Sequence, residues 1–428
     1  INLSNLTFGT ASGNYQNGNL TGMNLGRGQI IIEGNGVDAS LTEKFTLISN
    51  YILANAAIFG GSELELQAGS GTFDLNSASF SNSTEEILGQ FGIDAGEMGA
   101  MYAGKVNIKA STNGLGVNIP ADIIASSGGI TISAEGNIIY NNLNATENIN
   151  ISGDSIIGGG TVTSNSFNLD GNIWSNTGNI SVANLQINTN LLENLGIING
   201  DIAEINSHII LNDGSIFGSD ILLNAESLTN EGQIVSSSLL EINALETLQN
   251  NGSIIANSNL NIKAGNLVNE GNLTSNQKLE IFAQNITNNS LIASGGNASL
   301  TGVNSIVNNS EIVAGTNLSL ISDGKIVNNS GASILSLGNI EIIGLTEKKA
   351  ESFENLTASL RAYGDISIFA NQISNLGTDT FGTSSGYTIS TIYYPKPSGY
   401  YSWTLMWQQV ATSTITTQNS LISAGGNL

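Results

Sequence analysis

The 428-residue sequence contains no cysteine and only 3 prolines. The missing thiols exclude disulfide bonds, cysteine-based catalysis and zinc sites built from cysteine. A chain without cysteine suits an exported bacterial protein that stays unfolded in transit, although many cytosolic proteins also lack the residue. The absence therefore restricts the chemistry of this protein more than its location.

Basic residues are scarce. The 11 lysines and arginines face 34 acidic residues, which gives a formal net charge of −23, and Lys348–Lys349 is the only adjacent basic pair. Nucleic-acid binding requires clustered positive charge to replace counterions on the phosphates. We therefore exclude nucleic acid as a partner, and the acidity makes anionic surfaces poor partners in general.

Long hydrophobic runs are also missing. A membrane-spanning helix needs an apolar run of about 18 residues or more. No run in this sequence approaches that length, so the sequence predicts no transmembrane segment. The residues after Ile1 lack the basic and apolar regions of a signal peptide. The last residues, 423–428, resemble a repeat cut in its middle. We expect the sequence to be a fragment of a longer chain.

The residues that are abundant indicate strands and turns. Glycine occurs 51 times, and 40% of the residues are hydrophobic. Most of these are Ile, Leu and Val in short runs interrupted by Asn, Gly and Ser, which is the composition of strands joined by tight turns. This apolar content is sufficient for a buried core and too high for a disordered chain.

An asparagine-centred turn recurs along the chain at a nearly constant spacing. The first residue of this turn is always asparagine, whereas the third changes from Gly to Ser along the chain. The positions are Asn176, Asn194, Asn212, Asn230, Asn250, Asn269, Asn288, Asn308 and Asn328. An asparagine that faces inward could bond to its equivalent one coil away and form a ladder. Alternatively, asparagine recurs only because it is a good turn former; the unbroken register favours the ladder.

Alternating apolar pairs lie between these turns, for example Leu240-Glu-Ile242 and Leu260-Asn-Ile262. Alternation with period 2 indicates strands, and a fixed period of about 20 residues indicates a solenoid whose stacked coils share one core. Parallel crossover connections are right-handed. The sequence therefore predicts an all-β, right-handed parallel β-helix with coils of about 20 residues. The helical return of a leucine-rich repeat and the Gly-Gly-x-Gly-x-Asp pattern of calcium-binding coils are both missing.

Residues 1–140 repeat less regularly and carry family motifs. Glycine-rich turns occur at 34–36 and 56–61, followed by Gly99-Ala-Met-Tyr-Ala-Gly-Lys105 and Gly114-Leu-Gly-Val117. In content and order these motifs resemble the secretion domain of two-partner-secretion exoproteins, the family of filamentous haemagglutinins and contact-dependent growth inhibition proteins. The family's Asn-Pro motifs are absent from this sequence. From the resemblance we expect them, and the start of the domain, to lie upstream of Ile1.

The resemblance implies a partial secretion domain over 1–140 and haemagglutinin-type repeats over 141–377. It also implies a right-handed β-helix, export through an outer-membrane barrel transporter of the Omp85 type, and a secreted or cell-surface location. A receptor on a target or host cell would be a further partner. Three functions compete: the shaft of a contact-dependent growth inhibition exoprotein that projects a receptor-binding and toxin region, an adhesin, and a β-helix polysaccharide lyase or hydrolase. We favour the first.

Two segments near the C-terminus interrupt the repeat. Residues 345–360 are charged, without glycine or proline, and predict a loop or short helix. Residues 378–418 are aromatic and predict a protruding β-hairpin around the turn Lys396-Pro-Ser-Gly-Tyr400. The coil pattern returns at 419–428. The aromatic residues either contact a partner or pack on the shaft; the candidate contacts are Tyr393, Tyr394, Tyr400, Tyr401, Trp403 and Trp407.

Catalytic chemistry finds little support in the sequence. A polysaccharide lyase or hydrolase needs clustered or paired carboxylates, whereas the acidic residues here are spread singly. The single histidine, His208, has no obvious catalytic partner, and the two arginines are Arg27 and Arg361. We expect no catalytic residues, no cofactor and no metal in this fragment.

Overall fold

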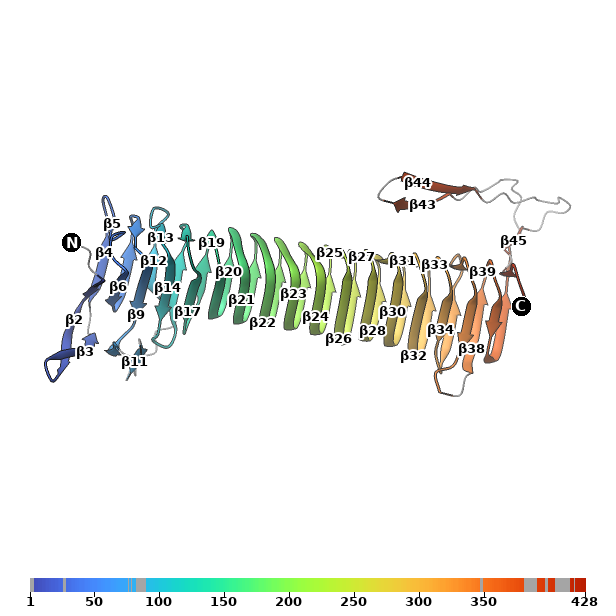
Figure 1. The fold of residues 1–428 in the computed structure, drawn as a ribbon. Coiled ribbons are helices and arrows are strands. Elements are labelled where there is room, and N and C mark those ends of the chain that lie inside the picture. The colour runs from blue at the N-terminus through green and yellow to red at the C-terminus, as the bar shows by residue number, and fades with distance from the viewer. Residues whose placement is uncertain are drawn as a thin grey trace.

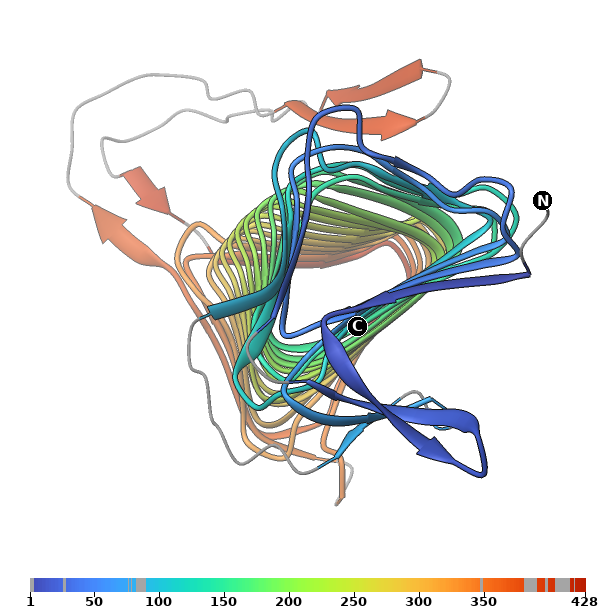
Figure 2. The ribbon, with the colours of Figure 1, turned by 90° about the vertical axis from the view of Figure 1, so that its left-hand side faces the viewer.

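The computed structural model describes residues 4–25, 28–75, 77, 79–81, 90–346, 349–380, 391–396, 399–404, 416–418 and 420–428. Every regular element in these residues is a β-strand. The strands wind into a long rod whose coils stack along one axis, as Figures 1 and 2 show from the side and from the end. About 18 coils of ~19 residues form it, which at ~4.8 Å per coil gives a rod of about 85 Å.

Short strands build the first part of the rod. They are β1 (Asn5–Gly9), β4 (Gln29–Ile32), β5 (Val37–Asp38), β6 (Lys44–Ser49), β7 (Tyr51–Ala54), β8 (Ile58–Phe59), β9 (Glu63–Ala68), β12 (Gln90–Ala95), β13 (Met101–Ala103), β14 (Lys105–Ala110), β15 (Leu115–Ile119), β16 (Ile123–Ala125), β17 (Ile130–Ala134), β18 (Ile138–Tyr140) and β19 (Leu143–Ala145).

The middle and the end of the rod follow with a more even period. Five long strands come first: β20 (Asn148–Gly158), β21 (Thr161–Asn176), β22 (Asn179–Asn194), β23 (Ile197–Asn212) and β24 (Ser215–Asn230). The remaining strands of the rod are β25 (Gln233–Ser236), β26 (Leu239–Asn250), β27 (Ser253–Ala256), β28 (Asn259–Asn269), β29 (Asn272–Ser275), β30 (Lys278–Asn288), β31 (Leu291–Ser294), β32 (Ala298–Asn308), β33 (Glu311–Ala314), β34 (Leu318–Ile321), β35 (Lys325–Asn328), β36 (Ser333–Ser336), β37 (Ile340–Ile343), β38 (Ala350–Leu356), β39 (Ser359–Ala362), β40 (Ile366–Ile368), β41 (Ala370–Leu376) and β46 (Leu421–Ala424).

Equivalent residues of successive coils stack in the interior. In the parallel pairs that join β23, β24, β25 and β27, Ile198 lies next to Ile216, then Ile234, then Ile254. All four side chains are fully buried. Burial of one such side chain contributes roughly 1.5–3 kcal/mol, but a single coil has no neighbour to bury it against. The core therefore exists only because coils stack, which is the property of a solenoid.

A small antiparallel sheet lies beside the first coils. Its strands, in the order β11-β10-β3-β2, are β2 (Ala11–Gln16), β3 (Asn19–Leu25), β10 (Gly71–Asp74) and β11 (Ser79–Ser81). The turn between β2 and β3 is Asn17-Gly18, with φ of 54° and 82°, the backbone that a tight hairpin turn requires and that asparagine and glycine tolerate. The sequence reasoning did not foresee this sheet, although Asn-Gly between two strand-like segments was a signal for its hairpin.

The predicted all-β parallel solenoid is confirmed. The loop or short helix predicted over 345–360 is wrong for most of its length, because residues 350–356 form β38 and residues 359–362 form β39. Ala350, Ser352 and Phe353 of β38 are buried, whereas Glu351 is exposed. The segment lacks glycine and carries several charges, and those features suggested a helix; its apolar residues nevertheless pack into the stacked core.

Candidate functional site

The nine asparagines that recur in the sequence form a continuous line of side-chain amides. Each amide nitrogen donates a hydrogen bond to the amide oxygen of the next asparagine at 2.7–2.8 Å, from Asn176 to Asn328. Their exposed fractions are 0–1%. Buried amides are costly unless hydrogen-bonded, and here each coil supplies the partner of the coil before it.

Backbone bonds complete this asparagine ladder. The Asn194 amide nitrogen also donates to the Ser215 carbonyl at 3.2 Å, and the Asn194 carbonyl accepts from the Asp213 and Gly214 backbone amides at 2.9 Å. A Cβ at Gly214 would lie 2.1 Å from the Gly196 carbonyl oxygen. The turn therefore requires glycine at this point, where successive coils approach closely.

The ladder continues beyond the asparagines singled out in the sequence. Asn328 donates to Asn355, and Asn355 donates to Asn375, each at 2.8 Å. Asn355 was missed because it lies 27 positions after Asn328, and because Thr357, with φ of 53°, stands where earlier turns have glycine or serine. The ladder thus crosses the segment that was expected to interrupt the coils.

The same column of the rod is apolar toward the N-terminus. Ala54 pairs with Ala95, and Ile119, Tyr140, Gly158 and Asn176 pair in that order. The two runs adjoin, since Asp94 and Asn118, the residues before Ala95 and Ile119, pair with each other. The first four of these side chains are buried. The interior turn position therefore changes from apolar to amide at Gly158.

Tyr140 fills the space at this change. A Cβ at Gly158 would lie 2.4 Å from the Tyr140 hydroxyl oxygen, so the ring occupies the room that a side chain at Gly158 would need. Burial raises the pKa of Tyr140, and the neighbouring Trp174 indole counteracts only part of this effect. The hydroxyl and the Trp174 Nε1–H are buried without a hydrogen bond of good geometry. The junction is therefore held by aromatic packing rather than by polar contacts.

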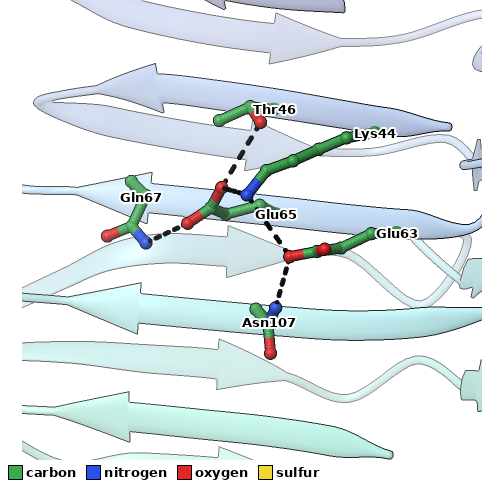
Figure 3. Close-up of polar contacts among 6 residues, drawn as sticks. All are labelled: Lys44, Thr46, Glu63, Glu65, Gln67 and Asn107. Atoms are coloured by element: carbon green, nitrogen blue, oxygen red, sulfur yellow. Dashed lines mark hydrogen bonds and ion pairs between the residues drawn. The ribbon is translucent and has the colours of Figure 1, made fainter. Parts of the chain in front are cut away.

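A charged cluster lies on the outer face of the first coils (Figure 3). Lys44 of β6 pairs with two carboxylates of β9, Glu65 at 2.7 Å and Glu63 at 3.3 Å. Gln67 donates to Glu65 at 2.8 Å, and Asn107 of β14 donates to Glu63 at 2.8 Å. The cluster joins three consecutive coils in a region that lacks the interior asparagine ladder.

The antiparallel sheet covers the neighbouring part of this face. Leu25 of β3 and Phe73 of β10 pack on the outward-facing Ile48 of β6. Glu65 is 7% and Gln67 3% exposed, which is unusual for outward-facing polar residues on a solenoid. Burial disfavours the charged form of Lys44, but Glu65 and Glu63 more than offset it, so the pKa of Lys44 is raised.

The predicted aromatic hairpin is present as backbone. Strands β43 (Thr391–Lys396) and β44 (Gly399–Thr404) pair antiparallel, with Tyr394 opposite Tyr401 and Ile392 opposite Trp403. A second antiparallel pair, β42 (Thr378–Thr380) with β45 (Thr416–Gln418), precedes β46. The side chains of Tyr393, Tyr394, Tyr400, Tyr401 and Trp403, and all of Trp407, lie outside the described residues. Their role as a contact surface remains a prediction.

The sequence singled out no catalytic residue, and His208, which was weighed for that role, lies exposed on the surface. His208 pairs with Glu226 at 3.0 Å, with both side chains exposed, and Arg27 lies outside the described residues. Within the described ranges no group of three His, Cys, Asp or Glu side chains could hold a metal ion. Nor does any helix there have the length and apolarity to cross a membrane.

The fold and the ladder thus define a parallel β-solenoid with a distinct first region. Residues 1–140 match the TPS secretion domain family. The first third of this chain is therefore similar to the secretion domains of two-partner-secretion exoproteins, CdiA among them.

Relatives in three bacteria illustrate this similarity. The Toxin CdiA of Yersinia pestis is 32% identical over 143 residues, the tRNA nuclease CdiA of Yersinia mollaretii 32% over 157, and the tRNA nuclease CdiA-2 of Burkholderia pseudomallei 31% over 144. The alignments cover 32–36% of this chain but only 4–5% of each relative. No solved structure matches the chain.

Proposed function

We propose that this chain is the secretion domain and proximal shaft of a contact-dependent growth inhibition exoprotein. The observation that carries the proposal is the match of residues 1–140 to the TPS secretion domain, together with 31–32% identity to CdiA relatives over that region. The shaft projects a distal receptor-binding and toxin region away from the producing cell.

The partner in this proposal is an outer-membrane barrel transporter, and the location is the cell surface or the medium. A solenoid suits such export because each coil contacts only its neighbours and can form as soon as it emerges. The chain also lacks cysteine, so no disulfide has to form before or during passage.

The shaft itself performs no catalysis in this proposal. The nuclease activities named for the relatives belong to those proteins, whereas the similarity covers only the first third of this chain. Any toxin activity would therefore belong to residues outside the matched region. The solenoid contributes reach and stiffness, since a rod of about 18 coils holds whatever follows it at about 85 Å from its base.

The test measures export and then growth inhibition. The natural full-length chain is expressed with and without the transporter encoded beside it, and surface and medium fractions are assayed for the shaft. We expect export only when the transporter is present.

Exporting cells are next mixed with target cells that lack a matching immunity protein, and the number of surviving target cells should fall. Export without killing, but with attachment to other cells, would replace toxin delivery with adhesion; export without the transporter would overturn the proposal.

A further inference from the structure

One outward column of the shaft is apolar over seven consecutive coils, with a single exception, Thr274. Its residues pair with one another from coil to coil and are Phe217, Val235, Ile255, Thr274, Ala293, Val313 and Leu335. The residue before each of them is a core Ile or Leu that is 0–1% exposed. Since successive residues of a strand point to opposite faces, these seven residues point outward. We call them the outer stripe.

The same column is polar in the coils before the stripe. Thr163, Ser181 and Asn199 precede Phe217 in the same register. The six short strands that follow on this face, β25, β27, β29, β31, β33 and β36, contain one charged residue, Glu311. A nearly uncharged apolar band on a chain with a net charge of −23 indicates a surface that something covers.

The aromatic hairpin is attached at the edge of this face. In earlier coils two residues separate the ladder asparagine from the next strand, as between Asn308 and Glu311 of β33. After the last ladder asparagine, Asn375, residues 376–420 precede β46. The two ends of this insertion lie together, because β42 pairs with β45. The hairpin is therefore tethered at the corner where the face of the stripe begins.

The register of β43 and β44 gives the hairpin two unlike faces. Residues directly opposite each other in an antiparallel pair share a face. Ile392 is opposite Trp403, and Tyr394 is opposite Tyr401, so one face is apolar and aromatic. The other face holds Thr391, Tyr393, Pro395, Tyr400, Ser402 and Thr404. A two-stranded hairpin is at best marginally stable alone in water, so its apolar face needs a surface to pack on.

The hairpin matches the stripe in length. A strand of six residues spans about 20 Å, and the five coils from Ile255 to Leu335 span about 19 Å at ~4.8 Å per coil. Residues 381–390, the shorter connection to the hairpin, can extend over at most about 33 Å. Ile255 lies six coils from β46, or about 29 Å. The hairpin can therefore reach this part of the stripe, and Figure 1 shows it turned back alongside the later coils.

Charge also favours the hairpin over other occupants. The one charged residue of β43 and β44 is Lys396, and the one charged residue of the six strands below is Glu311, of opposite sign. A second copy of this chain would instead bring another net charge of −23 beside the first, and the two would repel each other.

We propose that the hairpin of β43 and β44 packs its apolar face on the outer stripe between Ile255 and Leu335. The contact forms within one chain, so it goes beyond the proposed function and requires neither a transporter nor a receptor. The coils of the stripe precede the hairpin in the chain, so the surface is complete before the hairpin is made. Packing in this way leaves Tyr393 and Tyr400, on the opposite face, as the aromatic residues of the hairpin that a partner could contact.

The absence of cysteine from the chain allows a direct test. Ala293→Cys places a thiol in the middle of the stripe. Thr287→Cys is the matched control, because Thr287 lies in the same coil, points outward from the neighbouring face and is half-buried like Ala293. The rate of reaction with a soluble maleimide is measured in the full chain. The thiol at position 293 should react at least about tenfold more slowly than the thiol at 287, because its reaction requires the hairpin to open.

Two pairs of tyrosine substitutions identify which face of the hairpin is docked. Tyr394→Ser/Tyr401→Ser changes the apolar face and should speed the reaction at position 293 at least about fivefold. Tyr393→Ser/Tyr400→Ser makes the same change on the opposite face and should leave that rate within about twofold. Neither pair should alter the rate at position 287. Circular dichroism checks that the shaft stays folded.

A change in the stripe itself keeps the test informative if the tyrosine variants unfold the hairpin. Ile255→Glu/Leu335→Glu places two carboxylates under the hairpin and should speed hydrogen exchange in β43 and β44 at least about fivefold. Val268→Glu/Val327→Glu is its control, because these two valines are half-buried and point outward from the neighbouring face. It should leave exchange in the hairpin unchanged.

Each possible failure has a distinct meaning. If the thiol at position 293 reacts equally quickly with and without Tyr394→Ser/Tyr401→Ser, the hairpin does not cover the stripe and the inference is wrong. If both tyrosine pairs speed the reaction equally, the assigned face of the hairpin is wrong. Protection that disappears on dilution would overturn the inference by assigning the stripe to a second copy. None of these results would change the proposed function, whose test is transporter-dependent export.

Discussion

The secretion domain and the shaft use the same interior turn position in opposite ways. Over residues 1–140 the position holds apolar side chains such as Ala95 and Ile119, whereas from Asn176 onward it holds hydrogen-bonded amides. Apolar packing tolerates coils of unequal length, but an amide must meet its neighbour within hydrogen-bond distance. The ladder therefore fixes the turn of each coil, even where a longer loop lies between Asn328 and Asn355. The secretion domain has no such restraint and carries larger insertions.

The insertions illustrate this freedom. Between β9 and β14 the chain leaves the rod to form β10 and β11 and later returns to pair in register, with Val106 next to Leu64. From Asn176 to Asn328, by contrast, successive ladder asparagines lie 18, 19 or 20 positions apart. We infer that the shaft coils are interchangeable units, whereas the secretion domain has individual surfaces.

The largest expected effect is loss of a ladder amide. Asn250→Leu leaves the Asn230 amide without its acceptor and the Asn269 amide without its donor. Two unsatisfied buried groups cost together about 3 kcal/mol. Native-state hydrogen exchange should therefore speed up in β26 and β28 while the secretion domain keeps its protection. The same change at the exposed neighbour, Asn251→Leu, is the control and should leave both strands protected; equal effects at the two positions would refute the role of the ladder.

A second prediction concerns the junction. Gly158→Asn places a side chain where the Tyr140 hydroxyl lies, and overpacking costs about 2 kcal/mol. When Tyr140 is replaced by alanine, the new amide at position 158 can reach Asn176 and extend the ladder. Gly158→Asn should therefore lower stability less in the Tyr140→Ala variant than in the unaltered chain. A double-mutant cycle in thermal melts should show coupling between the two positions. Additive effects would mean that Tyr140 does not terminate the ladder.

A third and smaller effect is expected in the charged cluster. Lys44→Met removes the cation from Glu65, and because the Lys44 side chain is 37% exposed, the loss should be about 1 kcal/mol. Lys278→Met is the control, since the Lys278–Glu280 pair is more exposed on both sides and should change stability less. Hydrogen exchange in β6 and β9 is the measurement; no difference between the variants would show that the cluster does not align the first coils.

The same cluster predicts a pH dependence. The pKa of Lys44 in the folded chain is raised above its ordinary value of 10.5. The stabilising charge is thus fully present below pH 10.5 and is lost as the pH rises through the folded pKa. The unaltered secretion domain should lose protection in β6 and β9 above about pH 10.5, relative to the Lys44→Met variant. If protection from hydrogen exchange declined equally in the unaltered chain and in Lys44→Met, the loss of stability would not come from Lys44.

The smallest expected effect is at the loop before β38. Asp323 accepts hydrogen bonds from the Leu345 and Thr346 backbone amides, and bonds from Thr346 and Leu345 lower the pKa of its carboxyl. Asp323→Asn weakens this anchor on the surface. Limited proteolysis should then cut more quickly within 345–349, with the core strands unchanged. Unaltered cleavage would show that Asp323 does not hold the loop.

Much of the shaft could be predicted because its information is local and repeated. Asparagine recurs at the turn, Ile and Leu alternate between turns, and each coil needs only its neighbour. The turn at Asn355 escaped notice because one longer loop breaks the period, although its amide bonds as the others do.

The secretion domain was less predictable in detail. Its antiparallel sheet joins Met23 of β3 to Phe73 of β10, a pairing between segments far apart in the sequence that no local pattern encodes. The outward residues Phe59 and Tyr102 likewise lie next to each other only once the coils have stacked. Family motifs pointed to the domain, but not to the surface that distinguishes it.

The central claim is that shaft coils are interchangeable whereas the secretion domain directs export. Deleting residues 231–250 from the full-length chain removes one whole coil and joins Asn230 to Asn251-Gly252, so the ladder stays in register. Transporter-dependent export, measured as the chain reaching the cell surface and the medium, should equal that of the unaltered chain. Retention of this coil-deleted chain inside the cell, with the secretion domain intact, would contradict the account.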